Sequence, residues 1–239
     1  MNDEPISKSF TPFNKIPRLN RLCTITEKID GTNASVCIAH ESEVDGGYGI
    51  GGSHWISLVN GFYVAAGSRT RWIKPGDDNF GFAAWVRDNT TDLLKLGRGL
   101  HFGEWWGQGI QRGYGLAERR FSLFNTARWG DAAVRPACCN AVPVIYEGPF
   151  RTEATSVALD RLRIAGSQAA IGFMNPEGIV VYHRAANHLF KATIKGDEEG
   201  KHADAHVKKE RLPREPKDGS KGGRRKEQLP FDGPDRRVK

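Results

Sequence analysis

Short apolar runs separated by turn dipeptides dominate residues 1–195, and this pattern is typical of strands. Asn60-Gly61 is a preferred dipeptide of tight hairpin turns, so the runs on either side of it predict a hairpin. Asp30-Gly31 lies in the same way within TITEKIDGTNASV (24–36), which predicts a second hairpin. The predicted strands are 21–25, 34–39, 55–59, 62–66, 100–105, 120–125, 142–147, 178–183 and 189–194.

Two segments show helical patterns instead. Residues 82–96 form a mixed segment that predicts a helix. In 153–165, apolar residues recur at helical spacing from Ala154 to Ala165, and Gly166 follows as a helix-ending residue. Because the strands do not alternate strictly with these helices, we expect an α+β fold with largely antiparallel sheets and flanking helices.

The composition changes after residue 195. Residues 196–239 hold 13 Lys+Arg against 10 Asp+Glu, one Phe and neither Trp nor Tyr. Such a segment buries too little apolar surface to offset the entropy of ordering it. We therefore expect one folded domain over 1–195 and a charged, flexible C-terminal tail over 196–239.

Charge and composition narrow the class of protein. The 239-residue chain carries 35 Lys+Arg and 28 Asp+Glu, which gives a net charge of +7 and favours a polyanionic partner. Neither a secretory signal nor an apolar run of transmembrane length is present, so we expect a cytoplasmic protein with no membrane partner. The four cysteines contain no CxxC pattern and are expected to be reduced, buried thiols.

Lys28 is the first candidate for covalent chemistry. A deprotonated lysine is a nucleophile, and a cationic neighbour such as a metal ion promotes that state. On an extended chain Asp30 lies one alternation from Lys28, so both can point to the same side. Gly31 would let the backbone approach a ligand closely. The Lys-x-Asp-Gly pattern alone is unspecific, and its weight depends on the segments downstream.

Five further segments occur in an informative order. They are GSRTR (67–71), FGEW (102–105), RFSLFN (120–125), PEGIVV (176–181) and FKATIK (190–195). Lysine, arginine, glutamate, aromatic residue, glutamate and lysine in this order resemble the nucleotidyl motifs of the covalent nucleotidyltransferases. EKIDGTN and GSRTR are most similar to the ATP-dependent RNA ligases that seal nicks in duplex RNA. The resemblance covers about residues 20–195 and implies a ligase adenylation domain, which is ATP-grasp-like, over 1–195.

The resemblance implies roles for the residues around Lys28. Lys28 would attack the α-phosphorus of ATP and carry AMP as a phosphoramidate. Glu27 and Asn33 would recognise adenine or position the site, with ordinary strand or turn roles as the alternative. Asp30, next to Gly31 in the nucleotide site, would hold a metal ion through bound waters.

Downstream residues would complete the nucleotide site. Arg69 would bind phosphate, because its planar fork can contact two oxygens at once. Glu104 would accept from ribose hydroxyls or hold a metal-bound water, with a buried structural ion pair as its alternative. Phe124 would stack on adenine, with Phe121 as the alternative, and either can instead be a core aromatic residue.

The last two segments would supply charge around the phosphate. Glu177 would be a further carboxylate for the metal, and Lys191 would contact the α-phosphate. The family commonly has a second lysine two residues later, where this chain has Thr193. Lys195 would face the same side of a strand as Lys191 and can substitute for that second lysine. The implied metal ligands are Asp30, Glu104 and Glu177, acting through waters on Mg²⁺ or Mn²⁺.

The resemblance implies an ATP-dependent RNA ligase that acts in RNA repair. It would join 3′-hydroxyl and 5′-phosphate ends of nicked or broken RNA through lysyl-AMP at Lys28 and an adenylylated 5′ end. A GTP-dependent capping-type guanylyltransferase is the alternative, although those enzymes carry a further barrel domain for which 196–239 is short of strand patterns. A catalytically inactive nucleic-acid-binding relative is the other alternative.

Overall fold

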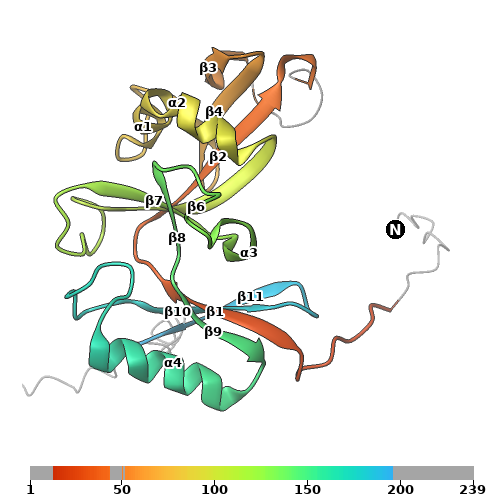
Figure 1. The fold of residues 1–239 in the computed structure, drawn as a ribbon, viewed down its shortest axis with the longest axis vertical. Coiled ribbons are helices and arrows are strands. Elements are labelled where there is room, and N and C mark those ends of the chain that lie inside the picture. The colour runs from red at the N-terminus through yellow and green to blue at the C-terminus, as the bar shows by residue number, and fades with distance from the viewer. Residues whose placement is uncertain (1–12, 44–49, 51, 196–239) are drawn as a thin grey trace, which may run out of the picture. The chain divides into compact units, whose positions relative to one another are not determined.

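The computed structural model describes residues 13–43, 50 and 52–195, drawn in colour in Figure 1. The predicted tail at 196–239 lies outside the described residues, so its boundary with the folded domain stays a prediction. Within the described residues, no helix combines the length and apolar character needed to span a bilayer.

A four-stranded antiparallel sheet forms one layer of the fold, with helix α4 (Thr152–Ala165) packed on one face (Figure 1). Its strands, in the spatial order β11-β10-β1-β9, are β1 (Leu22–Lys28), β9 (Val144–Pro149), β10 (Gly178–His183) and β11 (His188–Thr193). The buried side chains between sheet and helix are Cys23, Ile25, Ala158, Leu162, Ile179 and Val181. Cys23 and Ile25 alternate along β1 because every second residue of a strand faces the same side.

A seven-stranded sheet forms the second layer. Its strands are β2 (Thr32–His40), β3 (Trp55–Val59), β4 (Phe62–Ser68), β5 (Trp72–Ile73), β6 (Gly99–Gly107), β7 (Arg119–Leu123) and β8 (Cys139–Ala141). The order is β3-β4-β2-β6-β7-β8, with β5 paired to β4, and β7–β8 is the only parallel pair in the described chain. The prediction of an α+β fold with largely antiparallel sheets is confirmed.

Helices α1 (Phe82–Asp88) and α2 (Thr90–Leu93) cover one face of this larger sheet (Figure 1). Phe82 of α1 packs against Phe121 of β7 with ring centroids 5.0 Å apart, and Trp105 of β6 lies in the same cluster. The remaining short helices are η1 (Glu41–Glu43), η2 (Gly52–His54), η3 (Leu94–Leu96) and α3 (Thr126–Trp129). This face of the sheet is therefore a closed apolar core.

The hairpin at Asn60-Gly61 and the helix before Gly166 follow the sequence pattern closely. Asn60 and Gly61 adopt φ of 52° and 76°, the paired left-handed values that a tight β3–β4 turn requires. Helix α4 ends at Gly166 with φ 79°. The helix expected over 82–96 is divided at Asn89, whose side chain bonds the carbonyl of Trp85 and whose φ of −109° interrupts the helix. Strand β8 is an addition that the pattern did not predict.

The prediction of a hairpin at Asp30-Gly31 is wrong. Strand β1 belongs to the four-stranded sheet and β2 to the seven-stranded sheet, so the two never pair. Neither Asp30 nor Gly31 has the positive φ of a primed turn. The chain instead passes between the sheets through residues 29–31. A Cβ on Gly31 would lie 2.5 Å from the carbonyl oxygen of Trp105, so this glycine serves a close backbone approach.

We predict that Gly31→Ala lowers the free energy of unfolding by about 1–3 kcal/mol, because the added methyl group overpacks the passage between the sheets. Urea unfolding followed by far-UV circular dichroism measures the change. Gly52→Ala is the matched control, since no atom lies within 4 Å of a Cβ placed there. Equal effects of the two substitutions would contradict a special role for Gly31.

Candidate active site

Lys28 is the last residue of β1, and its ammonium group pairs with a carboxylate from the neighbouring strand. Antiparallel pairing places Lys28 opposite Gly178, the first residue of β10, and Glu177 directly precedes it. Lys28 Nζ donates to Glu177 Oε2 at 2.6 Å, and the two side chains are only 24% and 18% exposed. The register of the smaller sheet therefore joins two predicted site residues that are 149 positions apart in the sequence.

Glu104 enters the same region from the larger sheet. It lies on β6 opposite Asn33 of β2, and its Oε1 accepts a 3.1 Å hydrogen bond from the backbone N–H of Gly31. Burial raises the pKa of Glu104 from 4.5 to about 7. The charge of Lys28 and the Gly31 N–H act against burial, whereas Glu177 and Asp30 raise the pKa further. Three carboxylates and one ammonium thus interact electrostatically where the two sheets meet.

The face of the larger sheet that carries Glu104 is the one opposite the apolar core. Directly paired residues share a face, so Asn33, Glu104 and Ser122 project together, and Trp105 projects to the other side. Phe124 continues this face, with its backbone N–H bonded to the carbonyl of Phe102, and its side chain is 39% exposed. By contrast, Phe121 is fully buried in the core. Of the two aromatic candidates, only Phe124 is accessible to a ligand.

Asp30 is fixed by the segment that joins β6 and β7. Its backbone N–H donates to the hydroxyl oxygen of Tyr114 at 2.8 Å, and its Oδ2 accepts from Nε of Arg112 at 2.7 Å. The Tyr114 ring packs against Trp106 and Phe173, with centroids 4.9 and 4.6 Å away. Burial raises the pKa of the Tyr114 hydroxyl above its usual range, so this group is neutral and accepts a bond from Asp30.

Glu27 points away from Lys28, because adjacent residues of a strand face opposite sides. It is 1% exposed, and its carboxylate accepts bonds from the Ser167 hydroxyl and from the N–H groups of Gln168 and Ala169, at 2.6 to 2.9 Å. Burial raises its pKa, and these three hydrogen bonds partly oppose the shift. The Glu27 carboxylate is therefore bound to the loop after α4 and does not face Lys28.

The predicted basic residues are spread around the site. Lys191 of β11 lies opposite Val180, which lies opposite Thr26, so Lys191 shares a sheet face with Lys28. Lys195 Nζ is 3.5 Å from the side-chain oxygen of Asn175. Arg69 is exposed just beyond β4.

Two other positions in these basic segments have contacts of their own. Thr193 donates to the carbonyl of Lys195. Arg71 forms a two-bond ion pair with Asp77 at 2.9 Å, and both groups are more than half exposed. This pair gives Arg71 a partner on the surface of the larger sheet.

The donors near Lys28 suit a hard cation held through waters. In the described chain, no three His, Cys, Asp or Glu side chains converge as a direct metal cage. The carboxylates of Glu104, Glu177 and Asp30 are nevertheless close enough to raise the pKa of Glu104, and a divalent cation would relieve that repulsion. Oxygen-only donors with retained water match the preference of Mg²⁺, so the residues present fit such an ion.

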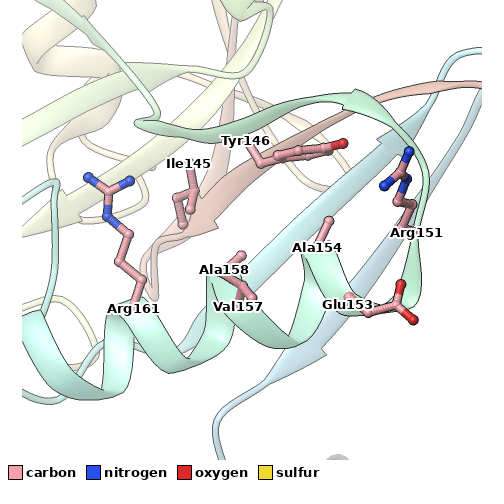
Figure 2. Close-up of a pocket in the computed structure, with 8 residues that line it drawn as sticks. All are labelled: Ile145, Tyr146, Arg151, Glu153, Ala154, Val157, Ala158 and Arg161. Atoms are coloured by element: carbon pink, nitrogen blue, oxygen red, sulfur yellow. The ribbon is translucent and has the colours of Figure 1, made fainter.

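A groove of about 340 Å³ lies elsewhere, between α4 and β9 (Figure 2). Figure 2 shows Arg151 and Arg161 at its two ends and Ile145 and Tyr146 along its β9 wall. Tyr146 is paired with Ile25, and Ile25 faces α4. The groove therefore lies on the side of the small sheet opposite Lys28 and is separate from the candidate site.

Sequence reasoning missed Arg112, Tyr114 and the loop at 167–169. The first two lie in GQGIQRGYG (107–115), where four glycines and the non-glycine residues Gln111 and Tyr114 have positive φ. Glycine density with an embedded arginine was the available signal for a tightly folded loop at a site. The loop at 167–169 had no such signal, because its role comes from the direction in which Glu27 points.

We predict that ionisation of Glu104 makes stability depend on pH. Its folded-state pKa of about 7 exceeds its ordinary value of 4.5, so its stabilising effect is full below pH 4.5 and is lost as the pH rises through 7. Between pH 7.5 and 5 the wild type should gain about 2–3 kcal/mol relative to Glu104→Gln. Urea unfolding of both proteins at the two pH values tests this, and parallel pH profiles would contradict it.

A sequence model of the RNA ligase family matches residues 21–195, whereas no curated protein sequence matches the chain. Among solved structures, a Naegleria gruberi RNA ligase mutant with ATP and Mn has a similar fold. Its TM-score is 0.50 at 16% identity, over 79% of this chain and 52% of that one.

Another mutant of the same ligase, with AMP and Mn, gives a TM-score of 0.47 at 16% identity, over 73% and 50% of the two chains. This chain thus spans about half the length of those ligases. The family model, however, extends from the strand that carries Lys28 to the segment that carries Lys191 and Lys195. The chain therefore belongs to the RNA ligase family.

Proposed function

We propose that this chain is an ATP-dependent RNA ligase that joins 3′-hydroxyl and 5′-phosphate ends through lysyl-AMP at Lys28. The observation that carries the proposal is the pair between Lys28 and Glu177 at the junction of two sheets, with Glu104 close by. The carboxylates could hold a divalent cation beside Lys28, and a cationic neighbour promotes the deprotonated, nucleophilic state of a lysine. Membership of the RNA ligase family supports the same conclusion.

In the first step, Lys28 Nζ would attack the α-phosphorus of ATP, and the bond to pyrophosphate would break. Lys28 must first give up a proton and the contact with Glu177, since an ammonium group has no free electron pair. Glu177, Glu104 and Asp30 would hold a Mg²⁺ or Mn²⁺ ion through waters. Such an ion lowers the charge on the phosphate oxygens and draws carboxylate charge away from Lys28.

Further residues, which come from both sheets, would bind or position the nucleotide. Phe124 would stack on adenine with its accessible ring, and Glu104 would accept from the ribose hydroxyls. Asn33 shares the face of Glu104, and Gly31 would contribute by letting β6 pack closely against the end of β1. Glu27 would contribute by fixing the loop at 167–169 beside the site.

Three basic residues would neutralise phosphate charge. Lys191, on the same face as Lys28, would contact the α-phosphate, and Lys195 would assist from the end of the strand. Arg69 would bind a phosphate group of ATP or RNA from the larger sheet. Their contribution is electrostatic, as is usual for phosphoryl transfer, where positioning and charge neutralisation supply most of the rate.

Two further phosphoryl transfers would complete the reaction. A 5′-phosphate oxygen of the RNA would attack the phosphorus of lysyl-AMP, which returns Lys28 to the free amine and leaves AMP on the 5′ end. The 3′-hydroxyl of the neighbouring strand would then attack that 5′-phosphate, lose its proton and displace AMP. The net result is one phosphodiester bond formed for one ATP converted to AMP and pyrophosphate.

The two alternatives make different demands on the site. A capping-type guanylyltransferase would use the same lysine on GTP, and an inactive relative would bind RNA without any covalent step. The family model favours the ligase. Nicked RNA duplexes, DNA duplexes and hybrids offered to the adenylylated protein then distinguish RNA from DNA as the substrate.

We predict that incubation with α-labelled ATP and Mg²⁺ yields covalently labelled protein and that Lys28→Ala abolishes the label. The reason is that no other lysine of the described chain occupies the junction of β1 and β10 beside Glu177. Denaturing gel electrophoresis measures the label, and peptide mapping locates it.

Lys15→Ala is the matched control, because Lys15 is exposed and precedes β1. It should label as the wild type does. Label from GTP instead of ATP would favour the capping alternative. A wild-type protein that binds RNA but takes no label from either nucleotide would favour the inactive relative.

We also predict that a chain ending at Lys195 still adenylylates itself, because every residue proposed for the nucleotide site lies in 1–195. Gel labelling of this truncated protein, checked for folding by circular dichroism, measures the reaction. Loss of lysyl-AMP formation in a folded truncated protein would refute the proposed domain boundary. A weaker sealing reaction with normal labelling would assign RNA binding to 196–239 and keep the boundary.

A further inference from the structure

We propose that Arg112 is a positioning residue of this site. It fixes the two chain segments that carry Lys28 and Glu177 relative to each other, without contacting either of these side chains. This inference rests on the proposed function of Lys28, but it concerns a residue that none of the nucleotidyl segments contains. Arg112 lies in the connection between β6 and β7 of the larger sheet, whereas Lys28 ends β1 of the smaller sheet and Glu177 directly precedes β10 of that sheet.

One side of the Arg112 guanidinium binds the segment that comes after Lys28. Arg112 Nε donates to Asp30 Oδ2 at 2.7 Å, and both side chains are only a little over a quarter exposed. Asp30 is two residues beyond Lys28, and the Tyr114 hydroxyl fixes its backbone N–H from the same connection. The exit of β1 is therefore fixed through both the side chain and the main chain of Asp30.

The other side of the guanidinium binds the segment that precedes Glu177. Arg112 Nη1 donates to the carbonyl oxygen of Asn175 at 3.0 Å and lies 3.4 Å from that of Pro176. Pro176 is bonded covalently to Glu177, so these contacts set where the Glu177 carboxylate leaves the chain. Phe173, earlier in this segment, packs on Tyr114. The connection between β6 and β7 therefore contacts the segment before Glu177 at two places.

Together these contacts close a ring around the candidate nucleophile. It runs from Lys28 to Asp30 along the chain, through Arg112 to Pro176, and from Glu177 back to Lys28 Nζ at 2.6 Å. A planar guanidinium can span two segments because its donors point in fixed and different directions. A lysine offers one point charge, so it can bind Asp30 or the carbonyls but does not bridge them in the same way.

Charge gives the ring a second effect. Arg112 neutralises Asp30, which lies close enough to raise the pKa of Glu104. Without Arg112, Asp30 would be an unpaired carboxylate in competition with Glu177 for the ammonium of Lys28. Arg112 thus determines that Lys28 faces Glu177 and not Asp30, as well as the distance between Lys28 and Glu177.

The test compares Arg112→Ala and Arg112→Lys with the wild type in single-turnover labelling by ATP. We expect the labelling rate at saturating ATP to fall about 10- to 100-fold in both variants, because small displacements of reacting groups have effects of this size. The ATP concentration for half-maximal rate should change less than about threefold, since Arg112 contacts none of the residues proposed to bind the base, the ribose or the phosphates. Arg163→Ala is the matched control, because Arg163 pairs with Asp160 on the outer surface of α4.

Hydrogen exchange measured by mass spectrometry provides a readout that does not depend on activity. In Arg112→Lys, peptides covering 28–33 and 173–178 should exchange faster together, while peptides of α4 should keep their wild-type rates. This pattern distinguishes the loss of the Arg112 contacts between the two segments from a general destabilisation of the fold. If Arg112→Ala does not fold, Arg112→Lys carries both measurements alone, because it retains the charge that Asp30 needs.

Three outcomes would overturn the inference. Wild-type labelling rates in both variants would show that Arg112 is dispensable, and a rise in the half-maximal ATP concentration with an unchanged maximal rate would make it a nucleotide ligand. Unchanged hydrogen exchange at 173–178 in Arg112→Lys would show that Arg112 does not hold the segment before Glu177. If the wild type takes no label, the proposed function fails, and the exchange data still decide whether Arg112 joins the two segments.

Discussion

The passage of the chain between two sheets at residues 29–31 is the constraint on which the rest of the structure depends. Gly31 lies against the backbone of Trp105 with no room for a side chain, and its N–H is bonded to Glu104. This close contact brings the end of β1 and the middle of β6 together. Lys28 from one sheet and Glu104 from the other share an electrostatic environment only because of it.

The site is organised by charges that offset each other. Glu177 faces Lys28, Arg112 faces Asp30, and Glu104 accepts from the Gly31 N–H and has a strongly raised pKa. A group of half-buried ions in this arrangement responds to any added charge, because low solvent exposure strengthens each interaction. Triphosphate and a divalent cation would bring large charges of both signs, so rearrangement of the Lys28 pair on binding is a natural consequence of the proposed function.

Much of the fold was predictable because it depends on local pattern. The Asn60-Gly61 hairpin, the helix ending at Gly166 and the strands around Glu104 and Glu177 all arise from residues within a few positions of each other. The Asp30-Gly31 hairpin was wrong for the same reason: the dipeptide favours a turn, but packing against β6 prevails over local preference. Phe124 was the expected stacking residue with Phe121 as the alternative, and only the burial of Phe121 in the folded structure separates the two.

The sequence by itself determined the candidate chemistry: a lysine nucleophile, carboxylates, an aromatic residue and late lysines in an order that resembles RNA ligases. It determined this because side-chain chemistry and order along the chain are properties of the sequence alone. Tertiary structure decided which of these groups meet. Glu27 turns away from its neighbour Lys28 and binds the loop at 167–169, while Arg112 reaches Asp30 across 82 positions. Such pairings depend on sheet register and on loop paths between sheets, which no local pattern records.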